Sequence, residues 1–313
     1  MNKQKPMVRK KTGTFLVLLV LLFVGSALVI KLNDTMFAKV PTVNHIELTQ
    51  TSQDLWVKIA KSDAIFLAVL TVPEATINQA VKNDQHSYVN IPANISEHLK
   101  GKPKDYPANI RHYTKDNFYR VTNNHLFAMH GKSVIIFAVM AQGEYYFTRL
   151  ENKSLQITDP LQIDKIKSEI IRQKTITNNW IPNKQLPLYD RVAELIEIAS
   201  KSGKEAYSFR QLENLGTGAV PAIIAQLDNR RRLNHRYITL KNHSPDRFEA
   251  FRHYSPKLMV DALTAILSQL TGQSFGTIYN GATDEKRTNI INGWRVYAMT
   301  HPDFENLRAS SGN

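Results

Sequence analysis

The chain has 313 residues, no cysteine and a formal net charge of +13 at pH 7. The lack of cysteine excludes disulfides, thiolate metal sites and cysteine nucleophiles. The charge is unevenly spread: residues 1–31 carry +6, residues 32–184 carry +4 and residues 185–313 carry +3. Nearly half of the excess therefore belongs to a short N-terminal segment. The mildly basic remainder argues against nucleic-acid binding and favours an acidic partner or an anionic envelope surface.

Residues 12–30 (TGTFLVLLVLLFVGSALVI) contain no charged side chain. A helix of this length would span about 28 Å, close to the ~30 Å hydrocarbon core of a bilayer. Residues 1–11 form a basic tail without an acidic residue, so the positive-inside bias predicts a cytoplasmic N-terminus and an extracytoplasmic body. Small residues at Gly25-Ser26-Ala27 leave a cleaved secretory signal open as the alternative. The apolar residues Leu28–Ile30 that follow favour a retained transmembrane anchor.

Residues 31–50 are mixed in composition and are interpreted as a stalk, and residues 51–160 are expected to form a β-rich domain. Short strands at this spacing favour a small barrel or sandwich, although periodicity alone also allows a buried helix at residues 64–72. The order of these segments, in which a strand ends at Leu99-Lys100-Gly101 and a Gly-Lys turn leads into a very apolar strand, resembles the OB-like barrels of secreted proteins. That resemblance implies a binding surface rather than catalysis. The expected strands are Ala64–Val72, Tyr88–Leu99, Ala108–Tyr113, Val134–Met140, Tyr145–Leu150 and Leu155–Thr158.

From Leu161 the apolar spacing becomes helical. Residues 161–184 are expected to hold a connecting helix, Leu161–Lys174, and a linker, followed by a helical domain at 185–300 and a tail at 301–313. One helix is expected to start after Ser255-Pro256 and another near Thr283-Asp284. The predicted buried faces are Leu188, Val192, Leu195, Ile196 and Ala199; Val220, Ile223, Ile224 and Leu227; Met259, Ala262, Leu263, Ile266, Leu267 and Leu270; and Ile290, Ile291, Trp294 and Ala298.

One stretch of the helical domain carries a family resemblance. Residues 215–229 (LGTGAVPAIIAQLDN) have a Leu-Gly turn, Ala-Val-Pro at a helix start, a run rich in Leu and Ile, and then Asp. This pattern resembles the second helix of a HEAT-type repeat, and the matching unit extends over about residues 208–232. Residues 246–300 do not repeat it at a fixed period. The resemblance implies stacked helical pairs that present a surface to another macromolecule, and it transfers no catalytic residue.

Ser274 is the one candidate nucleophile, because Gly272-Gln273-Ser274-Phe275-Gly276 fits the Gly-x-Ser-x-Gly pattern of a nucleophile elbow. That elbow needs a strand before the serine and a helix after it. The residues before Ser274 read as helix and those after it as loop, and only His301 follows as a triad histidine. We therefore expect a glycine-rich loop that ends a helix, with a serine hydrolase as the alternative.

No other motif indicates catalysis or a bound cofactor. The histidines show no His-Glu-x-x-His spacing, and no phosphate-binding glycine loop or dinucleotide fingerprint is present. We therefore expect no metal and no small-molecule cofactor. The densest basic cluster beyond the tail is Arg230, Arg231, Arg232 and Arg236. It is explained either by favourable charge at a helix C-terminus or by an anchor for an acidic partner, since arginine is favoured at interface hot spots.

Together these features predict an α+β protein with a single transmembrane helix, a small β-rich domain and a C-terminal HEAT-like helical domain. The expected location is the inner membrane of a bacterium, with the N-terminus in the cytoplasm and the body in the periplasm. Four Asn-x-Ser/Thr sites, at Asn33, Asn94, Asn152 and Asn242, would be glycosylation candidates in a eukaryotic cell. The expected function is non-catalytic protein binding in the cell envelope. The partner would be a secreted toxin, which makes the chain an immunity protein, or an envelope component for which it is a scaffold.

Overall fold

The computed structural model describes residues 50–83, 88–101, 108–114, 121–141, 144–148, 154–201, 203–234, 237–243, 249–278 and 281–301. They belong to one compact unit that begins at Gln50. The basic tail expected at residues 1–11, the membrane span expected at residues 12–30 and the stalk up to residue 49 lie outside the described residues. Within the described ranges, no helix combines the length and the apolar character that crossing a membrane requires.

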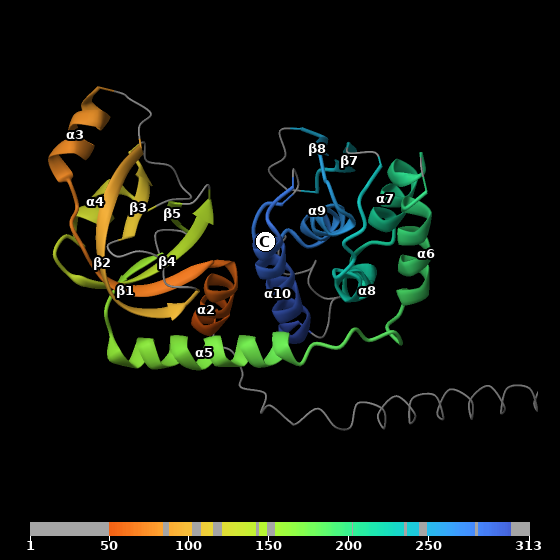
Figure 1. Cartoon of the computed structure of the whole chain (residues 1–313), viewed down its shortest axis with the longest axis horizontal. Coiled ribbons are helices and arrows are strands. Elements are labelled where there is room, and N and C mark those ends of the chain that lie inside the picture. Colours follow the sequence, from red (N-terminus) through yellow and green to blue (C-terminus); the bar gives the residue numbers. More distant parts are fainter. Residues whose placement is uncertain are drawn as a thin grey trace, which may run out of the picture. The chain divides into compact units, whose positions relative to one another are not determined.

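The described chain is of mixed α+β class, and its N-terminal part is a closed five-stranded barrel (Figure 1). The barrel strands pair in the order β1-β2-β3-β5-β4, and β4 pairs again with β1. All of these pairings are antiparallel except that of β3 with β5, and a sixth strand, β6, adds to β4. Of the two expected forms, barrel and sandwich, the barrel is correct. The strands are β1 (Ala64–Leu70), β2 (Tyr88–Lys100), β3 (Ala108–Tyr113), β4 (Ser133–Ala141), β5 (Glu144–Phe147) and β6 (Leu155–Ile157).

Burial along the strands follows their place in the barrel. Residues of β2 from Tyr88 to Ser96 alternate between exposed and buried, as expected for a strand with one face toward solvent. Strands β1 and β4 are buried on both faces, because α2 (Gln50–Lys61) and α5 (Pro160–Asn178) cover their outer side. These two strands coincide with the apolar runs in the sequence. The prediction of buried strands there is confirmed, and the helix alternative for residues 64–72 is wrong.

The sequence-based interpretation missed three helices in this part: α2, α3 (Glu74–Lys82) and α4 (Asn123–Phe127). The pattern of α2 is unusual because the helix faces two cores. Trp56 packs into the core of the helical part, whereas Ile59 packs on the outer side of the barrel. Leu55, Trp56, Ile59 and Ala60 nevertheless lie on one side of the helix at the spacing of an amphipathic helix, so the sequence does contain a signal for α2.

The C-terminal part contains six α-helices, one 3₁₀ turn and one β-hairpin among the described residues. The helices share one hydrophobic core, in which α9 is buried along almost its whole length. Besides α5, the elements are α6 (Tyr189–Ala199), α7 (Glu205–Asn214), η1 (Thr217–Ala219), α8 (Val220–Ala225), β7 (Ile238–Lys241), β8 (Phe251–Tyr254), α9 (Met259–Thr271) and α10 (Asp284–Thr300). The hairpin was not predicted, because the alternation of Ile238 to Lys241 is only four residues long.

The predicted helix faces agree with the structure except at their ends. In α6, Val192, Leu195, Ile196 and Ala199 are buried as expected. Leu188 instead lies just before the helix with a φ of 62° and is 40% exposed. The last helix begins where the Thr283-Asp284 pair predicts, and the Thr283 hydroxyl accepts a hydrogen bond from the Lys286 amide at 3.2 Å.

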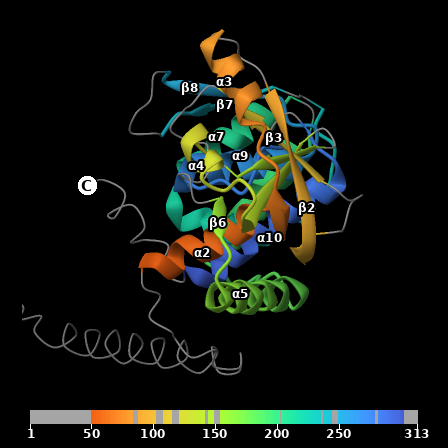
Figure 2. The ribbon, with the colours of Figure 1, turned by 90° about the vertical axis from the view of Figure 1, so that its left-hand side faces the viewer.

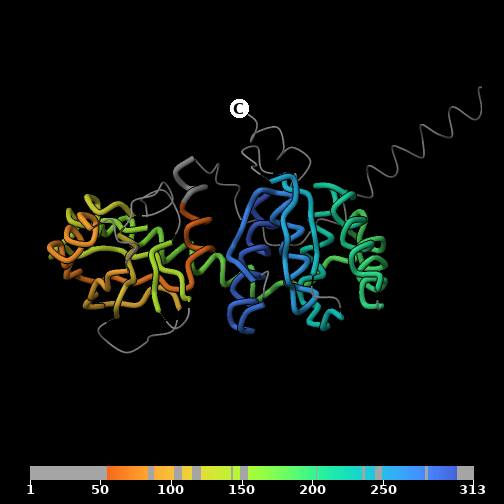
Figure 3. The backbone as a smooth tube through the Cα atoms, turned by 90° about the horizontal axis from the view of Figure 1, so that it is seen from above, coloured from red at the N-terminus to blue at the C-terminus, as the bar shows by residue number. Residues whose placement is uncertain are grey.

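Helices α2, α5 and α10 connect the barrel to the helical core. Figure 3 shows α2 beside α10, and in Figure 2 the helix α5 runs beneath the barrel strands. Along α5, Ile166 and Ile170 pack on the barrel, whereas Ile176 packs against the helical core. The Asp63 carboxylate accepts hydrogen bonds from Lys286 Nζ of α10 at 2.6 Å and from Asn289 Nδ2 at 3.2 Å. The barrel and the helices are therefore parts of one packed body.

Candidate functional site

The predicted arginine cluster lies in an extended segment that follows α8. The helix ends at Ala225, so Arg230 lies several residues beyond its last turn. Because the field of a helix dipole falls off within that turn, it does not explain the arginines. The segment is instead held against the start of α9: Met259 N donates to Arg231 O at 2.8 Å, and Leu233 N donates to Lys257 O at 3.1 Å.

The arginines of this segment have different surroundings. Arg231 Nη1 forms an ion pair with Glu197 Oε2 of α6 at 2.7 Å. The hydrogen bond and the charge of Arg231 lower the pKa of Glu197. Arg230 and Arg232 are exposed, and neither forms an ion pair with any residue that the structure describes. The fourth predicted member, Arg236, lies outside the described residues.

The hairpin β7–β8 lies between the arginine segment and the residues that lead into α9, so it extends the contact between these two segments. Ile238, Leu240 and Tyr254 anchor it in the helical core. Apart from Thr239, its outward side chains are aromatic or basic, and the rings of Tyr237 and His253 stack with centroids 5.5 Å apart. Tyr237 is 51% exposed.

We call this surface the basic ribbon. Residues 230–241 and 251–257 contain seven Lys or Arg residues and no Asp or Glu. A surface that joins uncompensated cations to exposed rings has the chemistry of a protein-binding hot spot with preference for an acidic partner. The basic ribbon is made of the exposed residues Arg230, Arg232, Tyr237, Lys241, Phe251, Arg252, His253 and Lys257.

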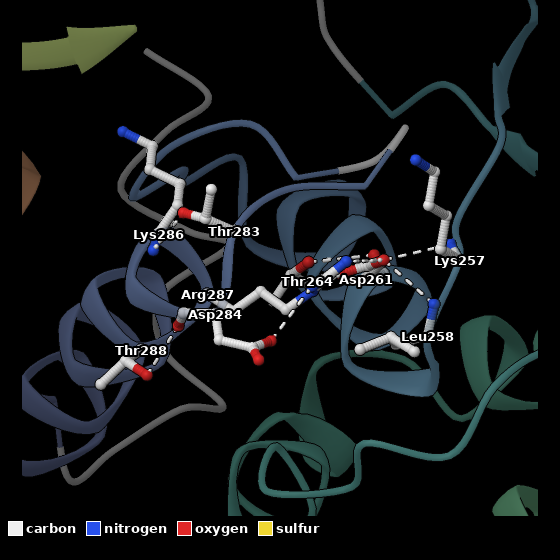
Figure 4. Close-up of polar contacts among 9 residues, drawn as sticks. All are labelled: Lys257, Leu258, Asp261, Thr264, Thr283, Asp284, Lys286, Arg287 and Thr288. Atoms are coloured by element: carbon white, nitrogen blue, oxygen red, sulfur yellow. Dashed lines mark hydrogen bonds and ion pairs between the residues drawn. The ribbon is translucent and has the colours of Figure 1, made fainter. Parts of the chain in front are cut away.

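A buried ion pair fixes the end of the basic ribbon to the helices (Figure 4). Asp261 of α9 is fully buried, and its oxygens accept hydrogen bonds from Arg287 Nε at 2.7 Å and Nη2 at 3.0 Å. The same carboxylate accepts the backbone N–H groups of Lys257 and Leu258, each at 3.0 Å. The hydrogen bond to Asp261 raises the pKa of Arg287 above its ordinary value. Two helices and the chain that enters α9 are thus held at one point.

Ser274 lies in a loop that follows helix α9, not on the strand-to-helix turn that a nucleophile elbow requires. Packing explains each part of its motif. Gly272 ends α9 with a φ of 69°, and Phe275 is buried against Trp294 with ring centroids 5.0 Å apart. The Ser274 hydroxyl donates to Gly276 O at 3.2 Å and accepts from Gly276 N at 3.3 Å. These contacts stabilise a loop.

A second surface, which is partly exposed and which the sequence analysis did not identify, lies on the outer face of strands β2, β3 and β5. Tyr88 lies opposite Tyr113 in the β2–β3 register, and Arg111 lies opposite Tyr146 in the β3–β5 register. The rings of Tyr88 and Tyr113 meet edge to face with centroids 5.0 Å apart. We call this surface the tyrosine face and define it by Tyr88, Asn90, Arg111, Tyr113, Glu144 and Tyr146.

Arg111 organises the tyrosine face. Its guanidinium lies 4.9 Å from the ring centroid of Tyr88 and 5.6 Å from that of Tyr146. It forms an ion pair with Glu144 and donates a hydrogen bond to the Tyr146 hydroxyl at 3.1 Å. A stacked and paired arginine holds the surrounding rings in place without leaving a net charge.

Among the described residues no group of three or more His, Asp and Glu side chains is arranged to hold a metal ion. Comparison of the chain with protein-family models, with characterised proteins and with solved structures finds no significant match.

Proposed function

We propose that the chain is a membrane-anchored protein-binding module without catalytic activity, and that it recognises an acidic protein partner through the basic ribbon. In this proposal the segment 12–30 anchors the chain in a bacterial inner membrane, with the N-terminus in the cytoplasm and the body in the periplasm. The partner is a secreted toxin, which the chain neutralises as an immunity protein, or a component of the cell envelope.

The observation that carries the proposal is the uncompensated charge of Arg230 and Arg232 on a well-supported segment. Neither guanidinium pairs with a described residue, although Arg231 between them does. Tyr237 and Phe251 add exposed aromatic area, 51% and 54% exposed, on the adjoining hairpin. Arginine and aromatic side chains dominate binding energy at protein interfaces. A rigid backbone under such residues reduces the entropy lost on association.

The proposed architecture agrees with a binding role. The closed strand order β1-β2-β3-β5-β4 supports an OB-like barrel. The consecutive helices α7 and α8, which contribute to the same core, are the proposed HEAT-like unit. Both are architectures that present surfaces to other molecules, and neither brings catalytic residues of its own.

A competition experiment tests the function. A strain that lacks the gene is grown against toxin-secreting kin and complemented with the wild-type chain or with variants. We expect the wild type to restore survival and the pair Arg230→Glu and Arg232→Glu to fail. The matched control reverses two exposed barrel lysines, Lys82→Glu and Lys132→Glu, and we expect it to protect fully. Unchanged survival of the deletion strain would exclude the immunity role and leave the scaffold role.

The topology has a separate test. When a reporter that is active only outside the cytosol is fused to the C-terminus, we expect it to be active. A fusion that works only with a cytosolic reporter would contradict the proposed orientation. Release of the native protein without detergent, with its N-terminus intact, would contradict the anchor.

A further inference from the structure

The backbone hydrogen bonds of the hairpin β7–β8 show which groups face its two edges. Asn242 N donates to Ala250 O at 2.9 Å, and these two residues continue the antiparallel register of the hairpin. Hydrogen-bonded pairs alternate with non-hydrogen-bonded pairs in such a ladder. The backbone N–H and C=O groups of Phe251 and His253 therefore point away from β7, toward the outer edge of β8.

The two outer edges of the hairpin differ. On β7, Lys241 N donates to Glu213 Oε1 of α7 at 2.8 Å, so this edge is capped by a helix. On β8, the outward backbone groups of Phe251 and His253 form no hydrogen bond with any residue that the structure describes, and both residues are exposed. A strand edge with open donors and acceptors is a template for another strand.

The side chains of β8 restrict which strand can add to this edge. Arg252 lies opposite the buried Leu240, so Arg252 is on the core side of the hairpin, whereas Phe251 and His253 are on its outer side. Arg252 is exposed and forms no ion pair within the described part of the chain. In an added strand, a residue directly opposite this arginine is favoured if it is acidic.

We propose that the outer edge of β8 pairs with an extended acidic segment of the protein partner, which adds a strand to the hairpin. This inference rests on the proposed function, because it states how the basic ribbon holds its acidic partner. In strand addition, backbone hydrogen bonds provide affinity and alternate side chains provide specificity. Here the backbone of Phe251 and His253 provides the first, and Arg252 with the other cations of the basic ribbon provides the second.

Binding is measured by fluorescence anisotropy on the full chain in phosphatidylcholine nanodiscs. The probe is a labelled decapeptide of alternating Glu and Val, and the control peptide replaces each Glu with Lys. We expect saturable binding of the acidic peptide only. His253→Pro removes an N–H that faces the open edge and not β7, so it should weaken binding by about tenfold or more. His253→Ala keeps that N–H and should retain affinity within about threefold.

Hydrogen exchange on the same complex provides a second measurement that does not depend on a variant. The N–H groups of Phe251 and His253 should become protected when the acidic peptide binds. The N–H of Arg252 faces β7, so its exchange should change little. Equal affinities of His253→Pro and His253→Ala, or no added protection at Phe251 and His253, would overturn strand addition.

The outcomes for this proposal and for the proposed function are distinct. Peptide binding that is lost in the pair Arg230→Glu and Arg232→Glu but is unaffected by His253→Pro would support an acidic partner and overturn strand addition. Binding of both peptides that only His253→Pro weakens would support strand addition and overturn the preference for an acidic segment. Failure of either peptide to bind would overturn strand addition, whereas the competition experiment would still decide the proposed function.

Discussion

The tyrosine face and the basic ribbon each contain arginines, but they differ in how that charge is satisfied. On the barrel, Arg111 is stacked between two tyrosine rings and paired with Glu144. On the helical part, Arg230 and Arg232 pair with no described residue. A compensated arginine organises its neighbours, whereas an uncompensated one remains available to a partner. The two surfaces should therefore differ in their response to mutation.

The largest expected effect concerns the support of the basic ribbon. Arg287→Met leaves the fully buried Asp261 carboxylate without its cation, which should lower the free energy of unfolding by about 3–5 kcal/mol. Urea denaturation measures this change. In the control, Asp284→Asn removes a partner of Arg287 that is 85% exposed and 3.3 Å away, and it should change stability by no more than about 0.5 kcal/mol. Equal losses in the two variants would show that the buried pair does not support the ribbon.

A pH titration tests the junction that holds both surfaces on one body. Burial lowers the pKa of Lys100 to about 8. The nearby charge of Asp63 raises this pKa, whereas the charges of Lys174 and Lys286 lower it. In the unfolded chain the pKa of this lysine is 10.5, so between about pH 8 and 10.5 it holds more protons there than in the folded chain. Its contribution to stability therefore rises with pH in that window. After allowance for solvent screening, we expect a rise of about 2 kcal/mol that Lys100→Met removes.

The Lys100 experiment is read as the difference between wild type and Lys100→Met at each pH, because Tyr297 acts in the opposite direction. Burial raises the pKa of Tyr297 to about 12, so its contribution to stability is lost as the pH rises above 10. The difference cancels this contribution. A difference that stays constant across the window would mean that Lys100 is not buried at the junction.

A matched pair of arginine substitutions tests the comparison itself. Arg111→Met removes an ion pair, a hydrogen bond and two ring contacts, and we expect a measurable fall in the unfolding midpoint. Arg232→Met removes no side-chain ion pair within the described residues and should leave Tm unchanged within about 2 °C. Thermal unfolding followed by circular dichroism provides both values. The reverse order would refute the distinction between the two surfaces.

The smallest expected effect is that of Ser274→Ala. Since its hydroxyl bonds to the backbone of Gly276 in the same loop, we expect no labelling of the wild type by a fluorophosphonate probe and no difference between the two chains. Labelling that disappears in Ser274→Ala would favour a serine hydrolase and remove the basis for a purely binding role.

Elements with a continuous apolar run or with one apolar face could be predicted from the sequence. The strands at residues 64–70 and 133–141, the buried face of α6 and the start of α10 at Thr283 follow from apolar spacing and capping residues. Helix α2 also has one apolar side, formed by Leu55, Trp56, Ile59 and Ala60, although Trp56 and Ile59 belong to different cores, so its spacing could have predicted it. The short hairpin β7–β8 depends on the helices that it covers.

The candidate sites were predictable to different extents. Arg230, Arg231 and Arg232 are adjacent in sequence, so composition alone identified the cluster, but only the structure distinguishes the paired Arg231 from its neighbours. Tyr88, Arg111 and Tyr146 are far apart in sequence and meet only through the β2–β3 and β3–β5 pairings. Only the strand registers place these three side chains beside one another.

Site-specific photocrosslinking in living cells tests whether the basic ribbon contacts a protein partner. A photoreactive phenylalanine analogue is placed at Phe251 in the basic ribbon or, as the control, at Tyr207 on α7; both positions are exposed. We expect a discrete protein adduct from position 251, none from position 207, and loss of the adduct when Arg230 and Arg232 are both changed to Glu. The same adducts from both positions, or an adduct from position 251 that survives the charge reversal, would contradict it.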